Sequence, residues 1–253
     1  MNALSEGAQG GSSGPILEDA VQAEPATISD AIQTVRSLDA VLDPCDGLKW
    51  FNWLYLQVTE ATAARIAAPG GFANPAWMAQ LDVHFARYYF KALAAWLGGR
   101  PVPGCWRAML ERRRETEVAR IQFALAGINA HINHDLPLAL VDTFEASGTA
   151  PQHGSVQYAD FTSLNATLNG LIESAKQELM VRLPGDALPP VSHLEDTLAA
   201  WSLSAAREAA WTNAELLWDV RDVPLLAGRY LDVIDGLSAV AGKALLVPAP
   251  VQA

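Results

Sequence analysis

Two histidines and an aspartate lie close together in the stretch HINHD, at His131, His134 and Asp135. On a helix, residues three and four positions apart share one face, so these three side chains point to the same side. A histidine and a carboxylate four residues apart can ligate one metal ion. His134 is then either a third ligand or a residue that hydrogen-bonds to one of the ligands. We therefore predict a divalent metal site, holding zinc or iron, at His131, His134 and Asp135.

Asp82 is a further candidate, because it interrupts the apolar segment LDVHFARYYF. A metal or acid/base centre in a helical protein needs a carboxylate from a second helix, and Asp82 meets that need. A bound metal ion lowers the pKa of a coordinated water and supplies hydroxide for hydrolysis. The leading hypothesis is metal-assisted hydrolysis of a small, partly apolar ester or phosphoester. In this hypothesis His134 and Asp82 are the catalytic residues, and His134 ligates the metal or shuttles protons.

Two other functions fit the same residues. Without a metal, His131 and His134 have a pKa range that suits proton transfer near neutrality. The chain would then be a cyclase or lyase acting on an apolar metabolite, with His134 or Asp135 as the acid/base and tryptophans lining the cavity. The third hypothesis is a non-catalytic binding module in which the polar cluster only fixes how the helices pack.

The other polar side chains of this stretch fall on the opposite face of the helix, at Gln122, Asn129 and Asn133. We expect that face to tie helices together through hydrogen bonds. Gly127 and Ala124 lie beneath the histidines, and their small side chains leave room for another helix or for a bound group. Pro137 lacks a backbone donor and disfavours helical geometry at the residue before it, so we expect the helix to kink or end there.

The apolar spacing along the chain indicates helices throughout. Helical runs are predicted at residues 29–42, 48–67, 75–97, 106–135, 158–183, 193–220 and 223–246. Segments rich in Pro and Gly separate most of these runs, and no alternating strand pattern of any length appears. The sequence therefore predicts an all-α, single-domain bundle of about seven helices with a long central helix kinked near Pro137. The domain is expected over residues 28–247, between a flexible tail at 1–27 and a short tail at 248–253.

Composition excludes several classes of partner. The formal net charge is −11, and the run ERRRE at residues 111–115 is bracketed by glutamates, which predicts a solvated helix face with i,i+4 pairs. Nucleic acids and anionic membranes need far more cations, and no apolar run is long enough for a membrane span. The N-terminus lacks a secretion signal, so we expect a cytoplasmic protein. Cys45 and Cys105 are expected to be reduced packing residues, with a single bridge between them as the alternative.

Two local resemblances support the metal hypothesis. HINHD resembles the His-x-x-x-Asp helix pair of the all-helical zinc-dependent phospholipase C and P1-nuclease group, although the rest of that ligand set, including an N-terminal tryptophan, has no counterpart here. The doublet at His134 and Asp135 also resembles that of the helical HD-type phosphohydrolases. The second resemblance implies His84 as an upstream ligand.

A longer resemblance covers most of the chain after about residue 30. It is carried by the segments DGLKWFNWLYLQVT, FANPAWMAQLDVHFARYYFKAL, WRAML, IQFALAGINAHINHDLPLALV and WSLSAAREAAWTNAELLW. In this order they are similar to the motifs of a bacterial domain-of-unknown-function family with an Asn-Ala-His-Ile-x-x-Asp-Leu signature. The resemblance implies a single helical domain and brings no established activity. The motif positions that it implies are Asn129, His131, Asp135, Asp46, Asp82 and Arg207.

Overall fold

A computed structural model describes residues 17–19, 21, 24–179 and 202–248 of the chain, and all regular structure in these residues is helical. In chain order the elements are α2 (Ile28–Val41), α3 (Gly47–Ala67), α4 (Pro75–Leu97), α5 (Gly104–Leu110), α6 (Arg120–Ala130), the π-helical turn η1 (His131–Asp135), α7 (Leu136–Ser147), α8 (Val156–Ser163), α9 (Asn165–Leu179), α11 (Leu203–Val220) and α12 (Pro224–Leu245). The prediction of an all-α, single-domain fold is confirmed.

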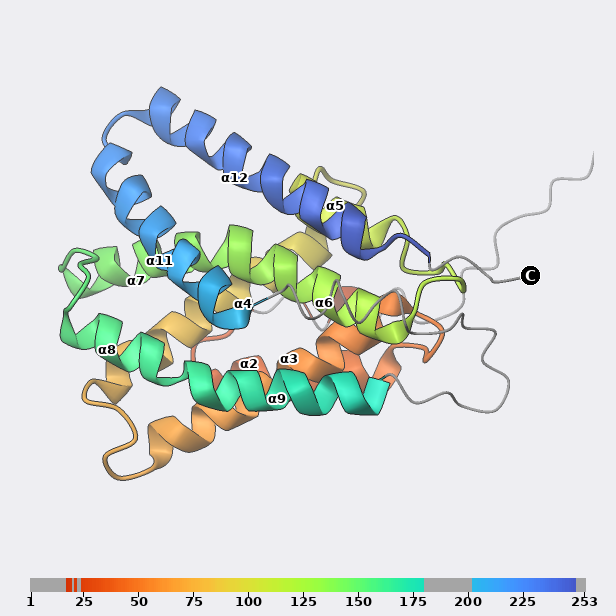
Figure 1. The fold of residues 1–253 in the computed structure, drawn as a ribbon, viewed down its shortest axis with the longest axis horizontal. Coiled ribbons are helices and arrows are strands. Elements are labelled where there is room, and N and C mark those ends of the chain that lie inside the picture. The colour runs from red at the N-terminus through yellow and green to blue at the C-terminus, as the bar shows by residue number, and fades with distance from the viewer. Residues whose placement is uncertain (1–16, 20, 22–23, 180–201, 249–253) are drawn as a thin grey trace, which may run out of the picture.

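The segment α6–η1–α7 forms the centre of the bundle. Helix α6 packs against α3 on one side and α12 on the other, while α7 packs against α4 and α11. Figure 1 shows the central segment running between α12 and the pair formed by α3 and α9. Because η1 contacts α4, α11 and α12 as well as its two neighbours in the chain, its side chains reach several different helices.

The central helix does not end at Pro137. Regular α-helical geometry stops at Ala130, and the backbone N–H of Leu136 donates to the carbonyl of His131, five residues back, which widens the turn. Pro137 then lies in the first turn of α7. In a regular α-helix the proline ring would clash with the carbonyl four residues earlier, and the wide turn gives the chain a way past that clash. Such π-turns occur frequently at functional sites.

Two predicted helices are each divided in the structure. The run at 106–135 breaks after α5, and the chain turns through residues 111–119 before α6 begins. Within this turn Arg113 forms an ion pair of 3.1 Å with Asp46, and its carbonyl accepts the N–H of Gly47. The prediction of a helix here is therefore wrong, because tertiary contacts with the start of α3 override the local helical pattern. Glu111, Arg114 and Glu115 are nevertheless exposed, as expected for a solvated run. The run at 158–183 is likewise divided at Leu164, between α8 and α9.

The start of the first predicted helix also differs slightly. Thr27, rather than Ser29, caps α2, since its side chain accepts the N–H of Asp30 and the Asp30 carboxylate accepts the N–H of Thr27. Part of the expected N-terminal tail packs on the bundle: Leu17 and Val21 are buried in the core, and Arg87 donates to the carbonyl of Pro25. The predicted helical residues 180–183 and 193–201 lie outside the described residues.

The two faces predicted for the central helix are both occupied by other helices. Gln122 donates to the carbonyls of Leu245 and Val247, and Asn129 donates to the carbonyl of Ser238, so this face ties α6 to α12 as predicted. The room at Gly127 is filled by Phe51 of α3, because a Cβ atom at position 127 would lie 2.3 Å from the Phe51 ring. Among the described residues, no helix is long and apolar enough to cross a membrane.

Candidate functional site

Asp135 is the centre of the predicted cluster, and it holds both histidines. His131 Nδ1 lies 2.8 Å from one carboxylate oxygen of Asp135, and His134 Nδ1 lies 2.7 Å from the other. The indole N–H of Trp106, from α5, donates to the same carboxylate at 2.9 Å. An ionised carboxylate only accepts hydrogen bonds, so both Nδ1 atoms carry a proton and both Nε2 atoms point away. The three predicted residues do lie together, but the two histidines hydrogen-bond to Asp135 and the three side chains do not surround a single metal position.

Burial and hydrogen bonding compete at these three groups. Burial raises the pKa of Asp135, but the hydrogen bonds from the two histidines outweigh burial and hold that pKa below its usual value. At His131 burial prevails and lowers the pKa. At His134 burial also opposes the charged form, yet the hydrogen bond and the charge of Asp135 outweigh it and raise the pKa. Burial thus favours the neutral form of His131, whereas the Asp135 carboxylate favours the charged form of His134.

His131 faces an aromatic and apolar part of the core. Its ring lies parallel to that of Phe85 with centroids 3.5 Å apart, and Tyr55 packs edge-on against it at 4.8 Å. Its Nε2 atom is buried and has no hydrogen-bond partner among the described residues. His131, Tyr55 and Arg207 line a cavity of about 30 Å³, which we call the Tyr55 cavity.

Asp82 lies apart from this trio, and no hydrogen bond or ion pair found among the described residues joins it to them. It lines a second cavity of about 30 Å³, the Asp82 cavity, which shares Val58, Phe85, Leu168 and Arg207 with the first. Burial raises the pKa of Asp82 to about 7, and its Oδ2 atom has no hydrogen-bond partner. The residues that line the two cavities include no tryptophan, so a tryptophan-lined cavity is not what the structure provides here.

His134 faces a different set of groups. Donor atoms of Cys105, His134 and Asp235, from α5, η1 and α12, all lie within 4.8 Å of one another. Asp235 is partly exposed and accepts the backbone N–H groups of Gly104 at 2.7 Å and Cys105 at 2.9 Å. Imidazole, thiolate and carboxylate are the ligand types that zinc takes in proteins, and a carboxylate behind the histidine, as Asp135 is here, is the usual support.

Cys105 and Asp235 are not among the site residues that the sequence predicts. Both cysteines are free, Cys105 is buried as predicted, and Cys45 is exposed rather than packed in the core. Asp235 lies on the last helix, far along the chain from the histidines. The one hint of Asp235 in the sequence is an aspartate beside Ile234, a buried residue of an apolar helix. That position does not reveal which residues of other helices Asp235 contacts.

Other candidates from the sequence make structural contacts. His84 Nδ1 lies 3.1 Å from Thr143 Oγ1, so the HD-type resemblance does not bring it to His134. Asp46 accepts the N–H of Leu48 at the start of α3. Asn52 donates to the carbonyl of Val35, as expected for a residue that fixes helix packing.

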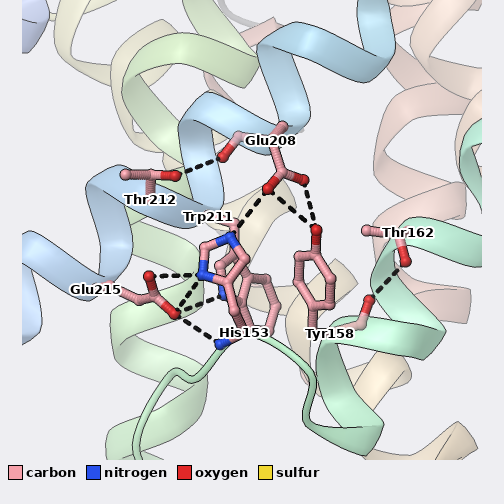
Figure 2. A network of polar contacts seen from close by, with 7 residues as sticks. All are labelled: His153, Tyr158, Thr162, Glu208, Trp211, Thr212 and Glu215. Carbon is pink, nitrogen blue, oxygen red and sulfur yellow. Dashed lines mark hydrogen bonds and ion pairs between the residues drawn. The ribbon is translucent and has the colours of Figure 1, made fainter.

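A separate polar network lies at the surface, between the loop before α8 and helix α11 (Figure 2). His153 Nδ1 lies 2.8 Å from Glu215 and its Nε2 lies 2.9 Å from Glu208, while Tyr158 donates to Glu208 and Trp211 to Glu215. Two carboxylates on one ring require both nitrogens to donate, and the hydrogen bond to Glu208 is the first cause that raises the pKa of His153. This network fastens the loop to α11.

Comparison with known proteins supplies a family but no activity. The model of a family of unknown function (DUF5995) matches residues 28–248. No curated protein and no solved structure matches the chain. The match covers most of the chain and agrees with the resemblance to a domain-of-unknown-function family seen in the sequence.

Proposed function

We propose that this protein, which belongs to the DUF5995 family of unknown function, binds a divalent metal ion with His134, Cys105 and Asp235. The observation that carries the proposal is the convergence of these three donor atoms, from three separate elements, within 4.8 Å. Side chains of three ligand types seldom meet by chance in the interior of a helical bundle, where polar groups are costly to bury. Zinc suits this mixed nitrogen, sulfur and oxygen donor set best.

Asp135 is not a ligand of the proposed site, but it hydrogen-bonds to the ligand His134. It fixes His134 through Nδ1, so in the neutral imidazole the lone pair of Nε2 is free to bind a cation, which replaces the Nε2 proton of the charged form, and this outer carboxylate makes the imidazole a better ligand. Burial raises the pKa of the Cys105 thiol, with the charges of Asp135 and Asp235 adding to the effect, so the group stays protonated until a cation binds. Relative to the sequence prediction, Asp135 moves from a ligand to a supporting position, and His131 is not part of the proposed site.

The proposed reaction is hydrolysis of a small ester or phosphoester in the cytoplasm. Three protein ligands with a further open position are the arrangement of catalytic zinc sites, and the bound ion supplies hydroxide at neutral pH. Asp235 is partly exposed, so a substrate has access from the side of α12. The proposed site lies at the turn η1, because its ligand His134 belongs to this turn and is held there by Asp135.

The experiment uses full-length protein made without a polyhistidine tag and stripped with a chelator. Zinc is titrated into the wild type and into His134→Gln, Cys105→Ser and Asp235→Asn, with His131→Gln as the matched control on the same helix. We expect one zinc per chain and at least about tenfold weaker binding in the three ligand variants, but not in the control. If His134→Gln binds zinc as tightly as the wild type does, the proposed site is contradicted.

The reaction is tested separately on the same zinc-loaded protein. Hydrolysis of p-nitrophenyl acetate and p-nitrophenyl phosphate is measured with and without the chelator. Turnover of either ester that is lost with the chelator and in His134→Gln supports a hydrolase. Zinc binding with no turnover of either ester contradicts the hydrolase and leaves the metal site standing.

A further inference from the structure

Three buried polar atoms that find no hydrogen-bond partner within the described part of the chain gather around the two adjoining cavities. They are the hydroxyl of Tyr55, Oδ2 of Asp82 and Nε2 of His131. The three residues are between 1% and 8% exposed. Buried polar groups are nearly always paired, since an unpaired one costs about 1–3 kcal/mol. Their concentration at one place therefore indicates a site for a ligand rather than an accident of packing.

Arg207, which lines both cavities, has no carboxylate partner among the residues that the structure describes. It is 5% exposed, its Nε donates to the side chain of Asn165 at 2.7 Å, and its Nη2 donates to the carbonyl of Phe161 at 2.8 Å. Its guanidinium carbon lies 3.9 Å from the Phe161 ring. Burial lowers the pKa of Arg207 to about 9, so the group is still a cation at neutral pH. A buried cation with only neutral partners is complementary to an anion.

The rest of the lining is apolar and the space is small. Apolar side chains from α3, α4, α9 and α11 form most of the walls, among them Val58, Phe85, Leu168, Ile172 and Leu203. Each cavity measures about 30 Å³. A water molecule needs about 10–15 Å³ of such space, so the two cavities together admit a ligand of only a few heavy atoms. This size excludes nucleotides and sugars without a rearrangement of the helices.

We propose that the two adjoining cavities bind a short-chain aliphatic monocarboxylate whose carboxylate pairs with Arg207. The hydroxyl of Tyr55 and the acid of Asp82 lie in the same walls and are donors for the carboxylate oxygens. The alkyl chain lies against Phe85 and Leu168, which both cavities share. The site is on the His131 side of Asp135 and does not depend on the metal ion proposed on the His134 side.

The test is a calorimetric titration of chelator-treated, full-length protein with propionate, and with propionamide as the neutral ligand of the same shape. We expect propionate to bind and to raise the melting temperature, as any ligand of the native state does, and propionamide to bind at least about tenfold more weakly. Equal binding of the two ligands, or no binding of propionate, overturns the proposal.

Two variants assign the ligand to this site. Arg207→Gln should lose propionate binding, while Arg100→Gln, an exposed arginine changed in the same way, should retain it. If Arg207→Gln does not fold, Leu168→Phe provides the answer, because the larger ring fills the space that both cavities share. If Leu168→Phe binds propionate as tightly as the wild type does, the proposed site is contradicted. Repeating the titration in His134→Gln separates the outcome from that of the metal proposal, since propionate binding should be unchanged there.

Discussion

The two sides of Asp135 differ although they are built from the same residue type. His131 and His134 both bond to Asp135 through Nδ1, at 2.8 and 2.7 Å. Yet His131 Nε2 lies among aromatic rings beside a small cavity, whereas His134 faces buried Cys105 and partly exposed Asp235. The spacing along the helix thus determines that both histidines share Asp135 as a partner. The helices packed around each histidine determine what its other nitrogen is able to bind.

The largest expected effect comes from removing the link between the two sides. Asp135→Asn exchanges a carboxylate that accepts three hydrogen bonds for an amide with a single oxygen. Because the donors are fully buried, we expect a loss of about 3–5 kcal/mol in the free energy of unfolding, measured by urea denaturation at neutral pH. Asp142→Asn, which replaces the charged acceptor of a single hydrogen bond from Tyr88 by a neutral one, is the control. A loss no larger than that of the control would show that the two sides are not coupled through Asp135.

The Asp82 cavity allows a test of the His131 side alone. Burial raises the pKa of Asp82 from 3.8 to about 7, so the folded state holds a proton that the unfolded state releases between these values. The wild type should therefore lose stability as the pH rises from about 4 to about 7 through this group, by about 1–4 kcal/mol. Asp82→Asn should remove this loss and be more stable than the wild type above neutral pH.

Denaturation at several pH values measures the Asp82 effect. Exposed Asp232→Asn serves as the control and should change the stability by less than about 0.5 kcal/mol. If Asp82→Asn and the wild type keep the same dependence on pH, burial does not perturb Asp82 in the way that the structure indicates.

His153 extends the comparison to a histidine between carboxylates at the surface, where its side chain is 43% exposed. The bonds to Glu208 and Glu215 raise the pKa of His153 in the folded state, so their stabilisation is complete below the unfolded pKa and disappears as the pH rises through the folded one. His153→Gln should cost less than about 1 kcal/mol at acidic pH, less in high salt, and almost nothing at alkaline pH. A larger loss at alkaline pH than at acidic pH would reverse the assigned sign.

The sequence predicted the fold well where helix periodicity is local. The helices at 48–67, 75–97 and 223–246 lie within one residue of α3, α4 and α12. The meeting of His131, His134 and Asp135 also followed from their spacing. The turn at 111–119 did not, because it depends on contacts between Arg113 and the start of α3.

The partners of the two histidines lie beyond the reach of spacing arguments. Cys105 and Asp235 come to His134 from α5 and α12, and Phe85 and Tyr55 come to His131 from α4 and α3. A single sequence shows which face of a helix is polar, but the packing of that helix against the others decides what the face meets. The sequence therefore predicted that His131, His134 and Asp135 meet, but not the residues of other helices that meet them.

Nitrogen-15 NMR of the histidine rings tests the central claim most directly. In chelator-treated protein at mildly alkaline pH, we predict that His131 and His134 both carry their proton on Nδ1, since each donates it to Asp135. Addition of zinc should then shift Nε2 of His134 and leave Nε2 of His131 unchanged. A shift of His131 Nε2 on adding zinc, or a proton on Nε2 instead of Nδ1 in either ring, would contradict the account.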